Sequence, residues 1–341
     1  MLRHLRFNWE NQFVKRTVIG IGLFALLAVA LGFRELFIYV FDAFVMVGVF
    51  ICVHEMMKAK KLGTKGVRDY YVYPYIVIAY LIFLLGIVIA NPFSFWIHIV
   101  LQLVLIFVLC IYVFFMAYTD RDFIKQCKLD KRPIGKASRS VVWEYVKLLI
   151  YPALLLFTLI PLNHIGNWVQ FENVETLVLT NAPLIGLFAL LLVFGISTFT
   201  DIFCYCAGKM LGGKKICPKI SPNKTVSGFI GGLFGGVIGA LVVMLALSAN
   251  AGVSGFFTQR IGNASAVIGF TIAIGLLGAF ITQMGDWFAS WTKRKHNIKD
   301  FGNILPGHGG LMDRFDGIAF NACFIFFVMM IVVFLVPYTA G

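Results

Sequence analysis

Two polar stretches of this chain contain the residue types that could bind a highly charged phosphate compound and react with it. The stretch from Ser290 to Asp316 holds Lys and Arg among Asp residues, and it places His308 between glycines. The stretch from Asp201 to Gly232 contains further Asp, Lys and Gly residues. Both stretches adjoin long apolar segments, where charged groups are costly to keep unless they have a function. The combination favours a site for a metal-bound, anionic substrate.

Four Asp residues are candidate ligands of a divalent metal ion. Asp201 and Asp286 each follow an apolar segment, and Asp313 and Asp316 precede another one. If that last stretch is helical, the spacing of three puts Asp313 and Asp316 on one face. Carboxylate oxygens, together with substrate phosphates, are ligands that Mg²⁺ prefers. Helix capping is the alternative explanation for Asp316 when it is considered alone.

Basic residues and glycines in the same stretches are candidates for contact with phosphate groups. Lys and Arg donate hydrogen bonds to phosphate oxygens, and glycines let backbone N–H groups approach an anion closely. We expect His308 to contact the substrate, and a structural hydrogen bond in a turn is its alternative. The basic candidates are Lys224, Lys293, Arg294, Lys299 and Arg314, and the glycines are Gly212, Gly213, Gly307, Gly309 and Gly310.

The elements that carry these residues are predicted to be membrane-spanning helices. Hydrophobic residues make up 60% of the chain and charged residues 13%, against about 25% charged in soluble domains. Apolar runs of about 20 residues indicate spanning helices rather than barrel strands. The prediction is an all-α polytopic protein with about nine helices, at residues 17–33, 36–54, 72–90, 94–118, 144–162, 177–200, 226–248, 265–285 and 317–337.

The distribution of positive charge predicts how these helices are oriented. Five regions, 3–16, 58–68, 121–147, 209–224 and 293–314, hold 27 of the 29 Lys and Arg residues. Strict alternation puts all five on one side, which the positive-inside rule makes cytoplasmic. The N-terminus is then cytoplasmic and the C-terminus external. The net charge of +13 is explained by topology and anionic lipid, so no nucleic-acid partner is expected.

Glycines and cysteines in the apolar segments are assigned no chemistry. The group Gly231, Gly232, Gly235, Gly236 and Gly239 contains the GxxxG spacing, which favours close helix packing. The seven cysteines lack the spacing of a zinc site or a disulfide framework. A short amphipathic helix is one alternative for the polar connection 119–143.

The Ser290–Asp316 stretch resembles the signature of the phosphatidate cytidylyltransferase (CDP-diacylglycerol synthase) family. The elements that match are Ser290, Lys293-Arg294, Lys299-Asp300, Pro306-Gly307-His308-Gly309-Gly310 and Asp313-Arg314-Phe315-Asp316. The earlier stretch is similar to the upstream block of the family, which includes Ser221-Pro222-Asn223-Lys224-Thr225 followed by Gly231-Gly232. The resemblance covers about residues 180–337, and the first half is compatible with the family only in containing several helices.

This resemblance implies an activity and a set of site residues. CTP and phosphatidate would give CDP-diacylglycerol and pyrophosphate, with CTP and a lipid phosphate as partners. Asp286 and Asp313 correspond to carboxylates of a Mg²⁺ site, which sometimes has a monovalent cation such as K⁺ beside it, and Asp201 and Asp316 are further candidate ligands. The expected catalytic residues are Asp286, Ser290, Lys293, Arg294, Lys299, Asp300, His308, Asp313, Arg314 and Asp316. The expected substrate-binding residues are Ser221, Asn223, Lys224, Thr225, Gly309 and Gly310.

Three departures from the family pattern leave alternatives open. Ser227 and Ala289 stand where the family usually has Glu, and Gly317 stands where it often has Ser. One alternative is CMP transfer to a different lipid phosphate or to a polyprenyl phosphate, and another is a non-catalytic membrane scaffold. A cation or solute transporter is the alternative from another class, but it predicts acids well inside helices rather than at one edge.

The expected organisation has two parts in one membrane. Residues 1–175 form less specific membrane helices, and residues 176–341 form the catalytic region. No cleavable signal peptide is evident, and the short basic N-terminus favours a bacterial plasma membrane with the site facing the cytoplasm, an organellar membrane being the alternative. Membrane lipids are expected partners, and a homodimer is left open.

Overall fold

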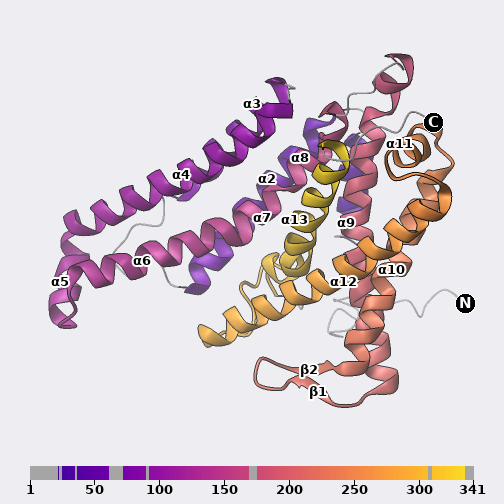
Figure 1. Cartoon of the computed structure of the whole chain (residues 1–341). Coiled ribbons are helices and arrows are strands. Elements are labelled where there is room, and N and C mark those ends of the chain that lie inside the picture. Colours follow the sequence, from indigo (N-terminus) through magenta and orange to yellow (C-terminus); the bar gives the residue numbers. More distant parts are fainter. Residues whose placement is uncertain are drawn as a thin grey trace, which may run out of the picture.

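The computed structural model describes residues 22, 25–34, 37–60, 72–89, 92–168, 175–305 and 309–334. Within these ranges the chain consists almost wholly of helices (Figure 1). The first half contains α2 (Tyr39–Lys60), α3 (Val72–Ile89), α4 (Pro92–Thr119), α5 (Arg121–Leu129), α6 (Ile134–Leu148), a π-helical turn (Leu149–Leu154), α7 (Leu155–Phe157), α8 (Leu159–Asn163) and a 3-10 turn (Ile165–Trp168). The second half contains α9 (Glu175–Leu211), β1 (Lys215–Cys217), β2 (Ser221–Thr225), α10 (Val226–Ser248), α11 (Ala251–Ile261), α12 (Ala264–Lys295) and α13 (Met312–Phe334).

Among the described residues, seven helical segments are long and apolar enough to cross a membrane. They are Tyr39–Ala59, Val100–Thr119, Ile134–Asn163, Leu184–Leu211, Val226–Ser248, Ala264–Lys295 and Met312–Val333. Two shorter apolar helices, Ala25–Arg34 and Val72–Ile82, overlap two other segments predicted to span, 17–33 and 72–90. The polytopic, helical membrane architecture is confirmed. The count of nine spans and the orientation of the termini stay predictions.

Glycines on α10 allow close packing against both α9 and α12. A Cβ atom on Gly235 would lie 2.5 Å from the carbonyl oxygen of Phe199 on α9, and one on Gly239 would lie 2.7 Å from another α9 carbonyl. On the opposite side, a Cβ atom on Gly236 would lie 2.8 Å from the Gly275 carbonyl oxygen of α12. Only glycine fits at such separations. The packing role predicted for this glycine group is confirmed.

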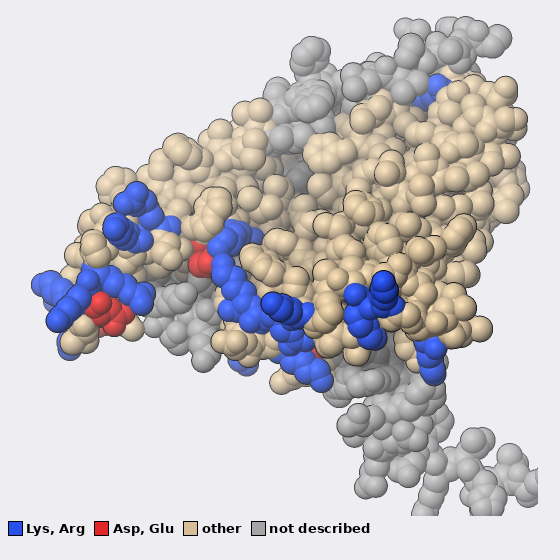
Figure 2. Space-filling model, turned by 60° about the horizontal axis from the view of Figure 1, so that its bottom comes forward, with Lys and Arg blue, Asp and Glu red and all other residues tan. Residues whose placement is uncertain are grey.

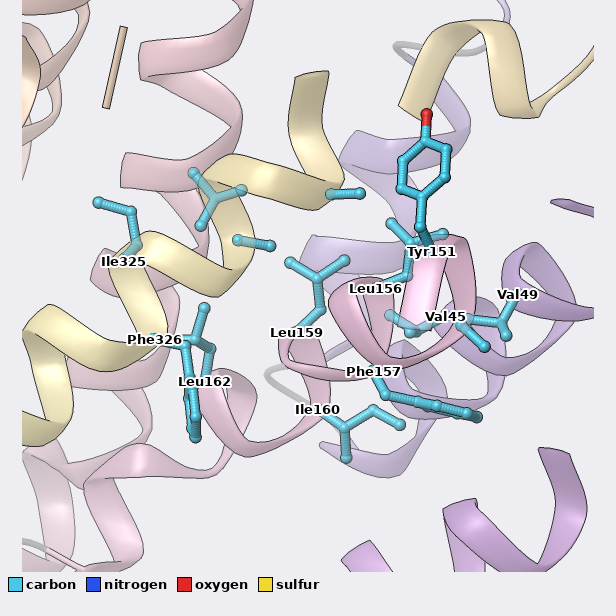
Figure 3. Packing of buried hydrophobic residues seen from close by; sticks show 14 of the residues in the cluster. Val45, Val49, Tyr151, Leu156, Phe157, Leu159, Ile160, Leu162, Ile325 and Phe326 are labelled. Atoms are coloured by element: carbon cyan, nitrogen blue, oxygen red, sulfur yellow. The ribbon is translucent and has the colours of Figure 1, made fainter. Parts of the chain in front are cut away.

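The first-half helices are held to α13 by a shared apolar core (Figure 3). Val45 and Val49 of α2, Phe157 of α7, and Ile325 and Phe326 of α13 are all buried. In a bilayer, lipid tails are as apolar as these side chains, so close van der Waals packing is what favours helix association. The core therefore joins α2 and α13, which are far apart in sequence.

A buried polar cluster connects the start of α2 to the end of α8. Arg34 donates to the carbonyl oxygen of Asn163 at 3.0 Å, and also to its side-chain oxygen. Asn163 Nδ2 donates to Asp42 Oδ1 at 2.9 Å, and His164 Nε2 lies 2.7 Å from Asp42 Oδ2. None of the four residues is more than 2% exposed. A charge buried so deeply is tolerated only when it is paired, so each residue of the cluster depends on the others.

Lys and Arg side chains gather on one face of the molecule (Figure 2). In Figure 1 this face is the lower end, where α5, the β1–β2 hairpin and the C-terminal end of α12 lie. The visible surface away from this face is mostly uncharged. Three of the predicted basic regions, 121–147, 209–224 and 293–314, contribute to this face, whereas 3–16 and most of 58–68 lie outside the described residues.

Several elements near the basic face extend beyond their predicted boundaries. α9 continues to Leu211 and α12 to Lys295, whereas their predicted ends were residues 200 and 285. The last turn of α12 holds three basic residues, which interact favourably with a helix C-terminus. α6 begins within the expected polar connection 119–143, and α5 is the amphipathic helix that was considered there. The hairpin was not predicted.

Candidate active site

Helices α12 and α13 cross at two glycines, and the crossing brings two Asp residues together. A Cβ atom on Gly285 would lie 2.8 Å from the Asp316 carbonyl oxygen, and one on Gly317 would lie 2.8 Å from Cγ2 of Thr282. The two backbones are therefore as close as their atoms allow. As a result, Asp286 on α12 and Asp316 on α13 line the same cavity and interact electrostatically. Gly317, one of the departures from the family pattern, packs directly against Thr282 at this crossing.

Asp201 on α9 belongs to the same group of acids. Next to it, Cys204 Sγ lies 3.3 Å from the side-chain oxygen of Gln283, which joins α9 to α12. Asp201 interacts electrostatically with Asp286 and with Arg314. Acids from three helices thus meet at one end of the bundle, where the basic face lies.

The β1–β2 hairpin forms another wall of the site. Its strands pair antiparallel, with Lys215 opposite Thr225. Lys224 directly precedes Thr225, and its Nζ lies 2.7 Å from Asp286 Oδ2. Thr225 is also the N-cap of α10, because its hydroxyl accepts a hydrogen bond from a first-turn N–H at 3.1 Å. The hairpin therefore holds a lysine over Asp286 and starts the next helix.

Ser227 closes the base of this hairpin. Its hydroxyl donates to the Gly212 carbonyl oxygen and lies 3.1 Å from the Thr225 hydroxyl. Gly212 and Gly213 have φ values of 60° and 106°, which glycine adopts without strain. Ser227 therefore has a structural role here, and Ala289, the other departure from an expected Glu, is fully buried in α12.

Asp313 organises the loop between α12 and α13. Its Oδ1 lies 2.8 Å from Lys293 Nζ. Its Oδ2 accepts hydrogen bonds from the N–H groups of Phe301 and Gly310, each at 2.9 Å. Gly309, directly before Gly310, has a φ of 83° in the left-handed region that favours glycine. Both carboxylate oxygens of Asp313 are therefore engaged by the protein itself.

These elements enclose a cavity of about 630 Å³, within the range of about 300–1,000 Å³ that is common for small-molecule sites. Residues from α9, β2, α12 and α13 all line it. The predicted site residues in its wall are Asp201, Ser221, Asn223, Lys224, Thr225, Asp286, Asp313, Arg314 and Asp316. Two sequence stretches that are about 80 residues apart thus form one site.

Other predicted residues lie beside the cavity rather than in its described lining. Lys293, Gly309 and Gly310 lie around Asp313 and act on the cavity by holding Asp313 in position. Arg294 is exposed and donates to the Ile220 carbonyl oxygen at 3.3 Å, which connects α12 to the hairpin. The lining also does not include Ser290 on α12, or Lys299 and Asp300 in the loop. Pro306, Gly307 and His308 lie outside the described residues.

Sequence reasoning missed one acid of the first half that reaches this region. Glu55 on α2 is 3% exposed, and its Oε2 accepts a hydrogen bond from the Met312 N–H at 2.9 Å. The only signal in the sequence is a Glu at the end of an apolar segment, just before a run of lysines. Gln283 and Trp287 of α12, which also line the cavity, were not singled out either.

The acids in the cavity fit a divalent cation that is shared with a substrate. Among the described residues, no three His, Cys, Asp or Glu side chains are grouped closely enough to hold a metal by themselves. Mg²⁺ is usually bound by one or two carboxylates together with waters and substrate phosphates rather than by a complete protein cage. Asp286 and Asp316, with Asp201 close by, provide carboxylates of that kind, and Asp313 is more fully engaged by its neighbours.

Comparison with known proteins identifies the family. The cytidylyltransferase family matches residues 14–332, which includes the first-half helices. The phosphatidate cytidylyltransferase of Rickettsia bellii (strain RML369-C) is 34% identical over 192 residues, covering 55% of this chain and 70% of the relative.

Two further phosphatidate cytidylyltransferases match over shorter segments. The one from Staphylococcus aureus (strain COL) is 42% identical over 135 residues, covering 40% of this chain and 46% of the relative. The one from Bacillus subtilis (strain 168) is 37% identical over 130 residues, covering 38% of this chain and 43% of the relative. These last two matches span less than half of each relative. With the family match extending over most of its length, this chain belongs to the cytidylyltransferase family.

Proposed function

We propose that this chain transfers the CMP group of CTP to phosphatidate. A phosphate oxygen of phosphatidate attacks the α-phosphorus of CTP, and the bond between that phosphorus and the oxygen of the β-phosphate breaks. The products are CDP-diacylglycerol and pyrophosphate. The attacking oxygen is already anionic, so a strong general base is unnecessary. The barrier lies in bringing two anions together and in stabilising the charge on the leaving pyrophosphate.

The observation that carries this proposal is the cavity in which Asp201, Asp286 and Asp316 meet Lys224 and Arg314. It lies at the charged end of a membrane bundle, where a water-soluble nucleotide and the headgroup of a lipid can both reach it. The relatives are named for acting on phosphatidate. A soluble enzyme would have no need of such a position, and a transporter would need its acids deeper in the helices.

The charge of the lining supports a metal ion as part of the site. Four Asp residues line the cavity against two Lys and one Arg, Lys209, Lys224 and Arg314, so the described lining alone would not attract a triphosphate. Two unit charges of like sign 4 Å apart repel by about 4 kcal/mol at an effective dielectric constant of 20. Bound Mg²⁺ would neutralise the phosphates, held by Asp286 and Asp316, with Asp201 and Asp313 as further ligands. We also propose a monovalent cation such as K⁺ beside the Mg²⁺.

The basic residues are proposed to act on the phosphates. Lys224 lies over Asp286, so its ammonium can pass from that carboxylate to a phosphate when a substrate enters. Arg314 is exposed in the cavity wall and can bind phosphate oxygens through two N–H groups. Lys293 keeps Asp313 in position, and through it the loop that carries Gly309 and Gly310. Ser221, Asn223 and Thr225 of β2 offer polar contacts to the nucleotide.

The topology and location are proposed from the charge pattern. Nine spans, a cytoplasmic N-terminus and an external C-terminus put the cavity in the cytoplasm, where CTP is available. A bacterial plasma membrane is the proposed location. In a variant that keeps only Cys206, which is exposed near the cavity, a membrane-impermeant thiol reagent should label inverted vesicles. Labelling confined to right-side-out vesicles would contradict this orientation.

The activity can be tested with purified protein in detergent micelles. CTP labelled at its α-phosphate, Mg²⁺ and phosphatidate should give a labelled lipid, and Asp286→Asn should give almost none. Asp130→Asn, on the exposed end of α5, is the matched control and should keep full activity. Polyprenyl phosphate and other lipid phosphates should be tried in parallel, because a product from one of them alone would replace phosphatidate as the acceptor. No labelled lipid from any acceptor would refute the proposal.

A further inference from the structure

Glu55 reaches the C-terminal half of the chain from a helix that sequence reasoning assigned no role. It lies on α2 and is 3% exposed. Its Oε2 accepts a hydrogen bond at 2.9 Å from the N–H of Met312, which is 257 residues later and is the first residue of α13. The Glu55 carboxylate therefore sits at the N-terminus of that helix, where free N–H groups and the helix dipole favour a negative charge.

The loop before α13 is shaped around this carboxylate. A Cβ atom on Gly302 would lie 2.6 Å from the Glu55 carboxyl carbon, and one on Gly310 would lie 2.7 Å from it. Any side chain at either glycine would overlap the acid. Gly310 is also one of the two residues whose N–H groups bind Asp313 Oδ2. Glu55 and Asp313 therefore hold consecutive parts of the same loop, one from outside α13 and the other from within it.

The N-terminal end of α13 is the part of that helix that faces the cavity. Asp313, Arg314 and Asp316 all line the cavity, whereas its described lining does not include Glu55. Besides its electrostatic interaction with Asp313, Glu55 influences these side chains through the backbone of α13 and the preceding loop. A shift of the helix start by a fraction of an ångström would move three cavity residues together, and errors of about 1 Å in an active site can cost about 100-fold in rate.

We infer that Glu55 is a positioning residue of the active site, which fixes the start of α13 so that Asp313, Arg314 and Asp316 face the substrate. This inference rests on the proposed function for its kinetic consequence, but its structural part does not depend on it. The first half of the chain thereby completes the site, rather than only anchoring it in the membrane.

The test compares Glu55→Gln, Glu55→Ala and a matched control. Glu144→Gln makes the same chemical change on α6, where Glu144 pairs with Lys147 at 2.8 Å. The amide oxygen of Gln can still accept from Met312, so Glu55→Gln should lower kcat about 10-fold and Glu55→Ala about 100-fold, with the KM for CTP changed less than about 3-fold. The control should keep the wild-type kcat, and all variants should be assayed well below their unfolding temperatures.

A second readout separates this inference from the proposed function. Amide hydrogen exchange in a peptide covering residues 309–316 should be about 10- to 100-fold faster in Glu55→Ala than in wild type or Glu144→Gln, because a hydrogen bond to a charged group is lost. Unchanged exchange there would overturn the inference even if no acceptor lipid reacts. If the wild type is active and Glu55→Ala keeps the wild-type kcat, the inference is overturned and the proposed function stands. Wild-type protein inactive with every acceptor would overturn the proposed function alone.

Discussion

Replacing Gly285 by Ala should reduce activity much more than it reduces stability. The new Cβ atom would lie 2.8 Å from the Asp316 carbonyl oxygen, 2.9 Å from Phe320 Cδ2 and 3.1 Å from the Gly317 Cα atom. Ordinary contacts of this kind are about 3.5–4.0 Å. The α12–α13 crossing must therefore widen by about 0.5–1 Å. Because all three neighbours belong to α13, the methyl group cannot be accommodated by the movement of one flexible side chain.

The expected magnitudes follow from this separation. Overpacking of this size costs about 1–3 kcal/mol, and the better helix propensity of Ala offsets about 1 kcal/mol of that. The net loss of stability is about 0–2 kcal/mol. The wider crossing moves Asp286 away from Asp316, and a displacement approaching 1 Å should lower kcat by about 100-fold.

The assay is the formation of labelled CDP-lipid, with the unfolding temperature of each variant measured in the same detergent. Gly269→Ala is the control, since it lies on the same helix and a Cβ atom there has no neighbour within 4 Å. It should keep full activity and be slightly more stable. If Gly285→Ala retained wild-type kcat, the crossing would not be what aligns the two carboxylates.

Three other changes test different parts of the structure. Lys224→Met removes the ammonium 2.7 Å from Asp286 and should lower kcat about 100-fold; unchanged kcat in the lipid assay would exclude a role in catalysis. Gly309→Ala places a residue with a side chain at a backbone φ of 83°, which should lower stability by about 1–2 kcal/mol. Its unfolding temperature should be lower than that of the control Gly255→Ala. Asp42→Ala removes the carboxylate that accepts from Asn163 Nδ2 and lies 2.7 Å from His164 Nε2, and should cost about 3–5 kcal/mol. For that variant kcat measured at low temperature should stay normal, and normal thermal stability would contradict the structural role of the cluster.

Part of the site could be predicted because its residues are close in sequence or carry a distinctive combination of types. Asp313 and Asp316 were expected on one helical face; Asp313 lies in the first turn of α13, Asp316 follows three residues later, and both line the cavity. Gly309 was expected to let its backbone approach an anion, and its φ of 83° is one that glycine adopts without strain. Predicting that Asp201 lies near Asp286 required only the assumption that the two charged stretches share one side of the membrane.

Other parts could not be predicted because they depend on tertiary contacts. Glu55 follows an apolar run and precedes lysines, so it looks like any acid near a helix end until α13 is placed beside it. The strand Ser221–Thr225 is short, polar and contains a Pro, and no alternation of apolar residues marks it. The last turns of α12 continue beyond its apolar pattern because Lys293 and Arg294 find partners in Asp313 and the Ile220 carbonyl oxygen.

The hydrogen bond from Met312 to Glu55 spans 257 residues, and this separation has a consequence for how the protein is made. During synthesis α2 enters the membrane long before α13 exists. Until α13 arrives, the Glu55 carboxylate lacks the helix N-terminus that it binds in the finished protein. An intermediate that lacks the last helix therefore carries this acid without its final hydrogen-bond partner. The arrival of α13 would supply that partner and complete the active site in the same step.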